Sequence, residues 1–178
     1  MTNRPVLHLV VCAAPPALHI GELVDLLMTD GWTVCVIATP TAATWIDRDA
    51  LADQTGYPVR AQWRLPGEPD LHPKADVVMV APATFNTINK WALGISDCLA
   101  LGILNEVIGS DLPVLAFPYA KHTLASHPAY GDHTQRLRAA GVEIDGEALS
   151  SSSASETFHW RGLTERAEGL LLSSPKSA

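Results

Sequence analysis

The stretch that decides the fold, residues 75–103, reads ADVVMVAPATFNTINKWALGISDCLALGI. It opens with an apolar run, residues 77–81, that shows no alternation and is typical of a parallel strand buried on both faces. Pro82 should end this strand, because proline has no N–H for the strand ladder. The polar residues that follow are types that cap the N-terminus of a helix: Thr84, Asn86 and Thr87. The stretch therefore predicts a buried strand, a polar elbow and a helix.

Two helices are expected after this elbow. Apolar residues recur at helical spacing over residues 88–95, and Gly94 stands where the first helix should end. Ser96 or Asp97 is expected to cap a second helix. Ligands of α/β proteins bind outside the carboxyl ends of the strands, where helix N-termini attract anions. The elbow is therefore a candidate binding site, although an ordinary well-capped turn explains the same residues equally well.

The remaining chain alternates apolar strands with helical patterns. Strands are expected at residues 5–12, 33–38, 111–117 and 142–144, with 60–64 as a further short candidate. Helices are expected at residues 17–29, 42–52, 134–140 and 160–172. This alternation predicts an α/β fold: a three-layer sandwich with a mostly parallel, Rossmann- or flavodoxin-like sheet. We expect a single domain over residues 1–178, with a flexible Ser-rich segment at 148–157 and a frayed tail at 173–178.

Composition argues against several classes of protein. The net charge is −7 and no basic block is present, which argues against nucleic acid as a partner. No apolar run reaches membrane-spanning length and no signal-peptide pattern opens the chain, so we expect a cytoplasmic protein with no membrane partner. Cys12, Cys35 and Cys98 are expected to be reduced core thiols, and no metal is expected because no two of them share ligand spacing. His8 is expected at a strand edge or hydrogen-bonded inside the protein.

Two motifs of the opening stretch resemble one known family. Residues 81–87, APATFNT, are similar to the P-A-S-A-N-T signature of the homo-oligomeric flavin-containing cysteine decarboxylases, and residues 94–99, GISDCL, are similar to that family's G-[LI]-[CS]-D-N-L. The family includes phosphopantothenoylcysteine decarboxylase and the decarboxylases of lantibiotic peptides. The similarity extends weakly from Pro5 to about Asp145. The resemblance implies a lyase that binds FMN, acts on a small-molecule or peptide substrate, and assembles as a homotrimer or as a dodecamer built from trimers.

The resemblance also implies a place for the FMN phosphate. The family's Gly-Ser loop after the first strand falls on Ala13 and Ala14, so the serine hydroxyl is missing here. Pro15 and Pro16 follow directly and carry no N–H groups. The backbone N–H groups of Ala13, Ala14 and Ala17 are then the donors that this loop can offer to an anion.

Further flavin contacts are implied at two turns. The turn after the second strand resembles the family's T-x-A-A-T. The resemblance implies that Thr39, and after it Thr41, contacts the phosphate or the ribityl chain of the flavin. The alternative is that the hydroxyls of these threonines only cap a helix or stabilise the turn. Around the flavin ring the resemblance places Pro82, Ala83, Thr84 and Asn86, of which Asn86 would also contact the substrate. Asp97 would cap the second helix and support the elbow.

The family's catalytic residues match this chain only in part. The family's catalytic histidine lies ahead of the central strand, and His72 is the histidine of this chain nearest to that position. The alternative is that His72 is an ordinary surface-loop residue. The family's P-x-M-N-x-x-M-W segment falls on residues 118–125, where Lys121 replaces the asparagine and could bind a carboxylate or a phosphate, or simply be solvated. His122 would serve as a general acid or base at a strand end. The candidate catalytic residues are therefore His72, Asn86, Lys121 and His122.

Together these residues predict an FMN-binding flavoprotein of the cysteine-decarboxylase-like family, acting as a flavin-dependent enzyme on a non-standard substrate. A flavin carrier, and a non-catalytic interaction protein that kept the fold with or without flavin, are the alternatives. His122, His127 and His133 do not share one helical face, which argues against a metal set. Trp91 is a candidate for a subunit contact or for the core.

Overall fold

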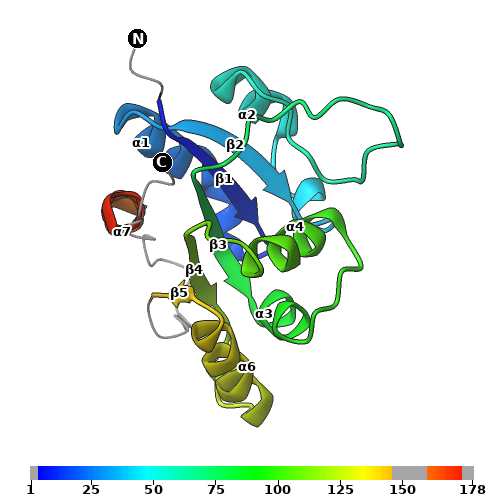
Figure 1. Cartoon of the computed structure of the whole chain (residues 1–178), viewed down its shortest axis with the longest axis vertical. Helices are drawn as coiled ribbons and strands as arrows, with labels where there is room; N and C mark the ends of the chain where they lie inside the picture. Colours follow the sequence, from blue (N-terminus) through cyan, green and yellow to red (C-terminus); the bar gives the residue numbers. More distant parts are fainter. Residues whose placement is uncertain (1–3, 146–159, 174–178) are drawn as a thin grey trace.

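Five parallel strands form the central sheet, in the spatial order β2-β1-β3-β4-β5 (Figure 1). This computed structural model describes residues 4–145 and 160–173. The strands are β1 (Val6–Val11), β2 (Thr33–Ala38), β3 (Val77–Thr84), β4 (Val114–Tyr119) and β5 (Val142–Ile144). Every neighbouring pair is parallel, which confirms the predicted α/β class and its parallel sheet.

The connections between the strands are helical. The helices of the described residues are α1 (Ile20–Thr29), α2 (Arg48–Thr55), α3 (Phe85–Ala92), α4 (Leu99–Ile108), α5 (His122–Ala125), α6 (Pro128–Ala139) and α7 (Trp160–Ser173), with 3₁₀ turns η1 (Pro15–His19) and η2 (Ala42–Thr44). None of these helices combines the length and the apolar character needed to cross a membrane. The expected flexible segment at 148–157 and the tail beyond Ser173 lie outside the described residues.

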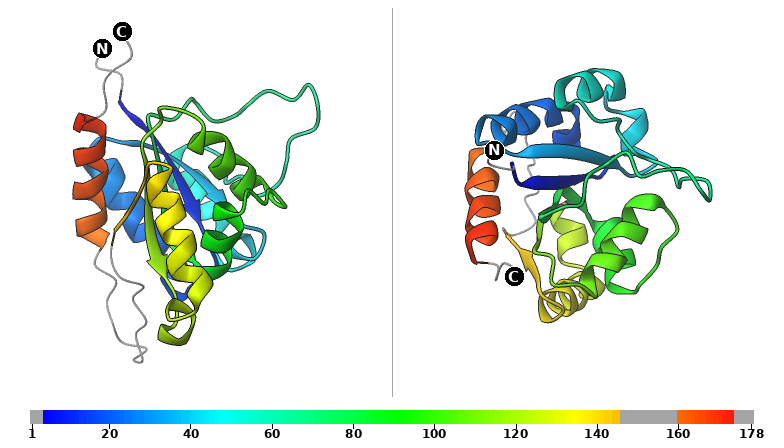
Figure 2. Two further views of the ribbon diagram at one scale, coloured as in Figure 1. Left: turned by 60° about the horizontal axis from the view of Figure 1, so that its bottom comes forward. Right: turned by 45° about the horizontal axis from the view of Figure 1, so that its top comes forward.

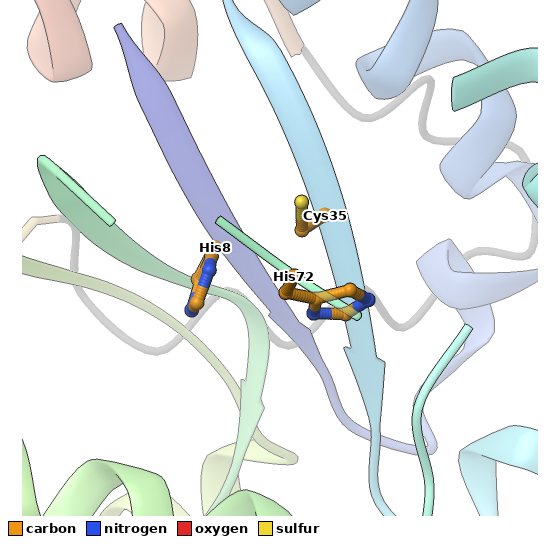
Figure 3. Close-up of side chains that lie close together, drawn as sticks. All are labelled: His8, Cys35 and His72. Atoms are coloured by element: carbon orange, nitrogen blue, oxygen red, sulfur yellow. The ribbon is translucent and has the colours of Figure 1, made fainter. Parts of the chain in front are cut away.

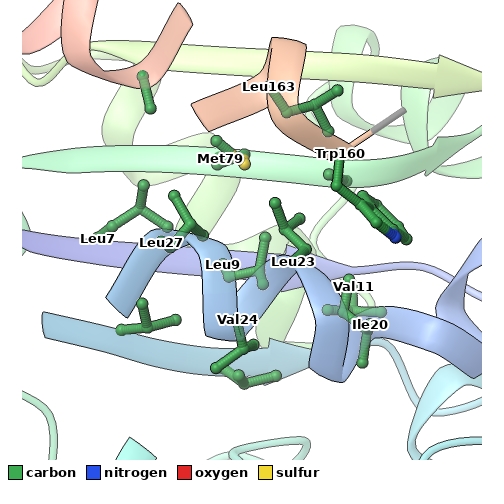
Figure 4. Close-up of a cluster of buried hydrophobic side chains, with 14 of the residues drawn as sticks. Leu7, Leu9, Val11, Ile20, Leu23, Val24, Leu27, Met79, Trp160 and Leu163 are labelled. Atoms are coloured by element: carbon green, nitrogen blue, oxygen red, sulfur yellow. The ribbon is translucent and has the colours of Figure 1, made fainter. Parts of the chain in front are cut away.

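Helices cover both faces of the sheet, as the two views of Figure 2 show. On one face α1 and α7 lie side by side, and Leu23 of α1 and Leu163 of α7 pack over Leu9 and Met79 of the sheet (Figure 4). Burial of this kind stabilises the fold by roughly 1.5–3 kcal/mol for each large apolar side chain. Helices α1 and α7 therefore stabilise the sheet by burying one of its faces.

The opposite face is covered by α3, α4 and α6. Val10, which alternates with Leu9 along β1, belongs to this second cluster with Ile88 and Trp91 of α3. Trp91 is only 1% exposed, and its indole Nε1 donates a hydrogen bond of 2.8 Å to the Leu104 carbonyl oxygen of α4. Trp91 is thus a core residue that joins two helices within one chain.

Strand β3 continues through Pro82, so the expectation that this proline ends the strand is wrong. The pairing of β3 with β4 shifts register between Val80 and Ala83, and the pairs Ala83 with Pro118 and Thr84 with Tyr119 continue beyond the shift. Such an irregularity lets a strand accommodate a residue that has no N–H to donate. The shift carries the strand two residues past the proline to the elbow.

The start of α4 also differs from the prediction. Its N-cap residue is Cys98, without a side-chain cap, rather than Ser96 or Asp97. The Asp97 carboxylate instead forms an ion pair with Lys90 of α3, and the Ser96 hydroxyl accepts a hydrogen bond from Asn105. Asp97 therefore ties the α3–α4 turn to α3 and does not cap α4.

The expected strand at residues 60–64 is absent from the described chain; only a single bridge joins Arg60 to Ile37 of β2. The long connection from α2 to β3 instead passes over the second face of the sheet (Figure 1). Trp63 in this connection lies so close to Gly102 of α4 that a Cβ added there would meet its ring at 2.0 Å. Glycine at this position lets the connection approach the helix.

Candidate functional site

The carboxyl ends of β1 and β3 mark the point where the strand order of the sheet reverses. From β1 the chain moves to β2 on one side, whereas β3, β4 and β5 follow on the other side. The loops that leave β1 and β3 stay linked, because the Cys12 N–H donates to the Pro82 carbonyl oxygen at 3.2 Å. Open α/β sheets bind ligands at such a reversal. With the exception of His72, the predicted site residues lie at, or directly after, the carboxyl ends of β1, β2, β3 and β4.

The loop after β1 offers fewer donors than expected. The Ala14 N–H already donates to the Cys12 carbonyl oxygen at 3.0 Å, and the Ala17 N–H donates to the Ala14 carbonyl oxygen at 2.8 Å. Pro15 and Pro16 form the first turn of η1 and have no N–H groups. Of the donors expected here, Ala13 keeps its N–H for a ligand.

The turn after β2 holds Thr39 in place. Its N–H donates to the Val11 carbonyl oxygen at 2.9 Å, and its hydroxyl oxygen accepts from the Ala42 N–H at 3.4 Å. The hydroxyl hydrogen of Thr39 can then point to a ligand at the strand end. The Thr41 side chain is exposed, and its carbonyl oxygen accepts from the Thr44 hydroxyl at 2.8 Å. Thr39 is therefore the better-ordered candidate of the two.

The elbow between β3 and α3 has the predicted cap. Thr84 is the N-cap residue, and its hydroxyl oxygen lies 3.4 Å from the Thr87 backbone nitrogen, which donates to it, and 3.0 Å from the Thr87 hydroxyl oxygen. The Ala81–Pro82 peptide bond is cis, and Pro82 and Ala83 are buried. Asn86, the second residue of α3, is exposed. Asn86 is thus the side chain at this helix start that a ligand can reach.

A buried thiol lies beneath the elbow. Cys12 is 1% exposed, and burial raises the pKa of its thiol, against the opposing effect of hydrogen bonds from Thr87 and Thr84. The group is therefore an uncharged thiol at neutral pH. Sequence reasoning assigned Cys12 to the core but did not place it under the candidate site.

Lys121 and His122 follow β4, the strand next to β3. Lys121 is the N-cap residue of α5 and His122 is its first residue, and both side chains are exposed. Because Thr84 pairs with Tyr119, the ends of β3 and β4 lie at the same edge of the sheet. The structure therefore brings Asn86, Lys121 and His122 to one edge.

The other two histidines of this region pack α6 against α3. His127 caps α6, its ring Nδ1 accepting from the Ala129 N–H at 3.1 Å, and the ring meets Phe85 edge-on at 5.8 Å. Phe85 also stacks on Tyr130 with the ring centroids 6.0 Å apart. His133 contacts the Asn89 side chain through a hydrogen bond of 2.7 Å. This aromatic contact was not foreseen, because the sequence shows no spacing that links α3 to α6.

His72 lies apart from the other candidate catalytic residues. It is 6% exposed and packs against His8, the third residue of β1, with the ring centroids 5.6 Å apart. Three residues of strand, about 10 Å, separate His8 from the carboxyl end of β1. The structure therefore does not bring His72 to the edge that holds Asn86, Lys121 and His122.

Burial also sets the protonation of the groups around His72. It lowers the pKa of both His72 and His8 below the usual imidazole value, and it raises the pKa of the Cys35 thiol to about 12. Nearby Arg60 acts in the same direction on the imidazoles, whereas Asp70 opposes it. Both rings are neutral at pH 7. The expectation that His8 is hydrogen-bonded inside the protein is confirmed, since its Nε2 lies 2.9 Å from the Pro73 carbonyl oxygen.

Two hollows of the described chain lie at the opposite, amino-terminal edge of the sheet. One is lined by the end of α4 and the start of β4, including Val107 and Val114, and the other by Pro5, Trp32 and residues of α7. The candidate site residues line neither hollow. Asn86, Lys121 and His122 instead lie exposed at the carboxyl edge.

The chain is similar in sequence to known flavoproteins. The model of the family described as Flavoprotein matches residues 1–156. The Coenzyme A biosynthesis bifunctional protein CoaBC of Thermococcus kodakarensis is 31% identical over 145 residues, which are 76% of this chain and 35% of that protein. The chain spans about a third of the length of the curated relatives that it matches.

Solved structures share the fold. A PPC decarboxylase mutant complexed with pantothenoylaminoethenethiol superposes with a TM-score of 0.79 at 20% identity, covering 96% of this chain and 100% of the other. The FMN binding protein AtHal3 superposes with a TM-score of 0.78 at 19% identity, covering 97% of this chain and 100% of the other. At these identities the likeness shows the fold alone.

Proposed function

This chain belongs to the flavoprotein family, and on that premise we propose that it binds FMN at the carboxyl edge of its sheet and acts as a flavin-dependent enzyme. The observation that carries the proposal is the meeting of the β1 loop, the Thr39 turn and the β3–α3 elbow where the chain reverses direction across the sheet. One of the structural neighbours, AtHal3, is an FMN binding protein, which supports the same cofactor.

The residues at this edge fit an FMN phosphate and ring. Ala13 N–H and the Thr39 hydroxyl can donate to phosphate oxygens, and the start of α3 adds the positive end of a helix dipole. Pro82 and Ala83 are buried beneath the elbow, so of the residues expected around the flavin ring the partly exposed Thr84 and the exposed Asn86 would face it. The phosphate contacts are fewer than a loop with free N–H groups would supply, because the N–H groups of Ala14 and Ala17 are engaged within the loop.

The roles of the chain's own residues follow from their positions. When bound, flavin would supply the acceptance and return of a hydride. Asn86, exposed at the start of α3, would bind flavin and substrate through its amide. Lys121 would hold a carboxylate or phosphate of the substrate by charge, and His122 would move a proton at the same edge. Because Lys121 stands where the cysteine decarboxylases have asparagine, we propose a small-molecule or peptide substrate other than theirs.

We also propose that the site is completed by assembly of the chain into a homotrimer, or a dodecamer of trimers. The support is that Asn86, Lys121 and His122 are all exposed at this edge. A second chain laid over this edge would exclude water from a bound flavin. Sedimentation of the purified protein tests this assembly directly.

A non-catalytic interaction protein that kept the fold is the second candidate. The observation in its favour is the β1 loop, where Pro15 and Pro16 replace two possible donors and Ala14 is already engaged. If the loop cannot hold a phosphate, the fold would persist without flavin, because most side chains of both core clusters come from the strands and the α-helices.

The visible absorption spectrum of the purified protein, before and after addition of FMN, tests the proposal. We expect a flavin band of altered shape and release of FMN on denaturation. Replacing Asn86 by alanine should weaken FMN binding by about tenfold, because one hydrogen bond of about 1.4 kcal/mol is lost. Asn105→Ala is the matched control, since this amide bonds Ile95 and Ser96 in the α3–α4 turn.

Three results would contradict all or part of the proposal. A colourless protein that also fails to bind added FMN would leave the interaction protein as the better account. Equal loss of affinity in Asn86→Ala and Asn105→Ala would mean that the effect is not local to the elbow. If the protein binds FMN but turns over no carboxylate substrate, the proposed flavin site stands and the proposed enzymatic role is wrong.

A further inference from the structure

Three potential metal ligands from distant parts of the chain meet on the second face of the sheet. His8 lies on β1, Cys35 lies opposite it on β2, and His72 belongs to the connection that crosses this face (Figure 3). One ligand atom of each side chain lies within 4.8 Å of the ligand atoms of the other two. Cys35 and His72 are buried and His8 is partly exposed. The pairing of β1 with β2 places the first two, and the path of the connection places the third.

Hydrogen bonds already orient both imidazoles as they are oriented in metal sites. The Nε2 atom of His72 lies 2.7 Å from the Pro58 carbonyl oxygen, and the Nε2 atom of His8 lies 2.9 Å from the Pro73 carbonyl oxygen. A carbonyl oxygen only accepts, so each Nε2 carries the hydrogen and each Nδ1 of a neutral ring keeps a lone pair. Metal-ligating histidines commonly donate their second ring N–H to a backbone carbonyl in this way.

One of these lone pairs has nothing to bind within the described chain. The Nδ1 atom of His72 is buried and has no hydrogen-bond partner, although the residue is only 6% exposed. A buried polar atom without a partner costs about 1–3 kcal/mol, so an apolar side chain would stabilise this position better. An unpaired nitrogen on a side chain that is grouped with a second histidine and a cysteine is explained if a cation binds it.

We propose that His8, Cys35 and His72 bind one zinc ion, with water in the fourth position. Two imidazole nitrogens and one thiolate form a donor set that zinc prefers, and three protein ligands with an open fourth position are a known zinc geometry. Binding replaces the proton of the Cys35 thiol, which leaves to bulk water, and both imidazoles bind as neutral rings. Water can approach from the side of the partly exposed His8.

The charges around the site permit a cation. Arg60 is the nearest cationic group, and Asp70 neutralises it through an ion pair of 2.9 Å. Asp70 also accepts a hydrogen bond from the His72 backbone N–H and pairs with Arg64 at 3.5 Å. Its carboxylate therefore holds the connection in place and offsets positive charge beside the zinc.

The zinc ion would link the α2–β3 connection to strands β1 and β2 of the sheet. This connection forms only one bridge to a strand within the described chain, and it carries exposed apolar side chains such as Trp63 and Leu65. A metal that joins β1, β2 and the connection would order this segment independently of any ligand at the carboxyl edge. The site is thus separate from the proposed flavin site.

Cobalt substitution of the full-length protein is the sharpest test. After treatment with a chelator, titration with Co²⁺ should saturate at one ion per chain and give the near-ultraviolet charge-transfer band of a thiolate ligand. Cys35→Ser should lose this band, and His72→Gln should weaken Co²⁺ and Zn²⁺ binding by at least about tenfold. Zn²⁺ should raise the unfolding temperature of the wild-type chain and leave that of folded Cys35→Ser unchanged.

Matched variants separate this site from adventitious binding. Cys98→Ser and His133→Gln remove the same side-chain types outside the cluster and should leave the cobalt spectrum unchanged. The proposal is overturned if the wild-type chain shows no thiolate band, or if the band survives in Cys35→Ser. Circular dichroism of Cys35→Ser checks that the variant is still folded when the cobalt band is lost. FMN titration of the same variant checks that flavin binding does not depend on the metal site.

Discussion

Burial distinguishes the three cysteines at the scale of single residues. Cys12 and Cys35 are buried free thiols, whereas Cys98 at the start of α4 is partly exposed. Burial raises the pKa of the Cys12 thiol, even though the Thr87 and Thr84 hydroxyls act in the opposite direction. Since the thiolate is the reactive form, a raised pKa lowers the reactive fraction at any pH below it.

We predict that iodoacetamide labels Cys98 first in the native protein at pH 8. Cys12 should react at least about tenfold more slowly than in urea, because its reaction requires a local opening that costs more than about 1.4 kcal/mol. Mapping of the labelled peptides by mass spectrometry measures both rates. Equal labelling of Cys12 in native and unfolded protein would show that the elbow does not shield it.

Histidines show how far single residues can be predicted. His8 was expected at a strand edge or hydrogen-bonded inside the protein, and its ring does form a hydrogen bond, with the Pro73 carbonyl oxygen. His72 was expected at the catalytic edge or on the surface, and the structure places it in neither position. The difference arises because the connection from α2 to β3 folds back across the sheet, and no local pattern encodes that path.

At the scale of elements, α1 forms because its apolar residues repeat on one face. Leu23, Val24 and Leu27 are fully buried against the sheet, whereas Leu18 in the preceding turn is 60% exposed. The expected single helix over residues 17–29 is split into η1 and α1, because two prolines open the segment. The buried face, rather than helix propensity, supplies most of the stability of such a helix.

We predict that Leu23→Ala lowers the free energy of unfolding by about 2–5 kcal/mol, because it leaves a cavity between α1 and the sheet. The same substitution at Leu18, which is 60% exposed, should change it by less than about 0.5 kcal/mol. Urea denaturation of the two variants, with unchanged slope, makes the comparison. Similar losses at both positions would mean that α1 does not pack as described.

Helix α7 shows what matters at the scale of the whole molecule. The family match ends at residue 156, before this helix begins. Trp160, Leu163 and Ala167 of α7 are nevertheless buried in the cluster that covers β3 and β4. Ion pairs from Arg161 to Asp30 and from Arg166 to Glu143 add contacts to α1 and β5. The sheet face is complete only when this helix is present.

We predict that a chain ending at residue 156 loses cooperative unfolding and binds a hydrophobic dye. Without α7, the side chains of Met79, Leu115 and Phe117 lose the cover of Trp160 and Leu163. Each lost burial costs roughly 1.5–3 kcal/mol, a large part of the stability of an ordinary domain. A chain ending at Ser173 is the control and should unfold like the full chain in calorimetry. A cooperative transition of the shorter chain would contradict the packing described for α7.

The sequence by itself determined the alternation of strands and helices, the parallel sheet, and a helix cap among Thr84, Asn86 and Thr87, because each depends on apolar periodicity or on residues close together in the chain. Only the tertiary structure decided that β3 runs through Pro82, that Ala14 has no N–H to spare, and that His8, Cys35 and His72 meet. These features depend on strand order and on the path of a long connection. Contacts between residues far apart in the chain arise from packing, and local sequence patterns do not contain them.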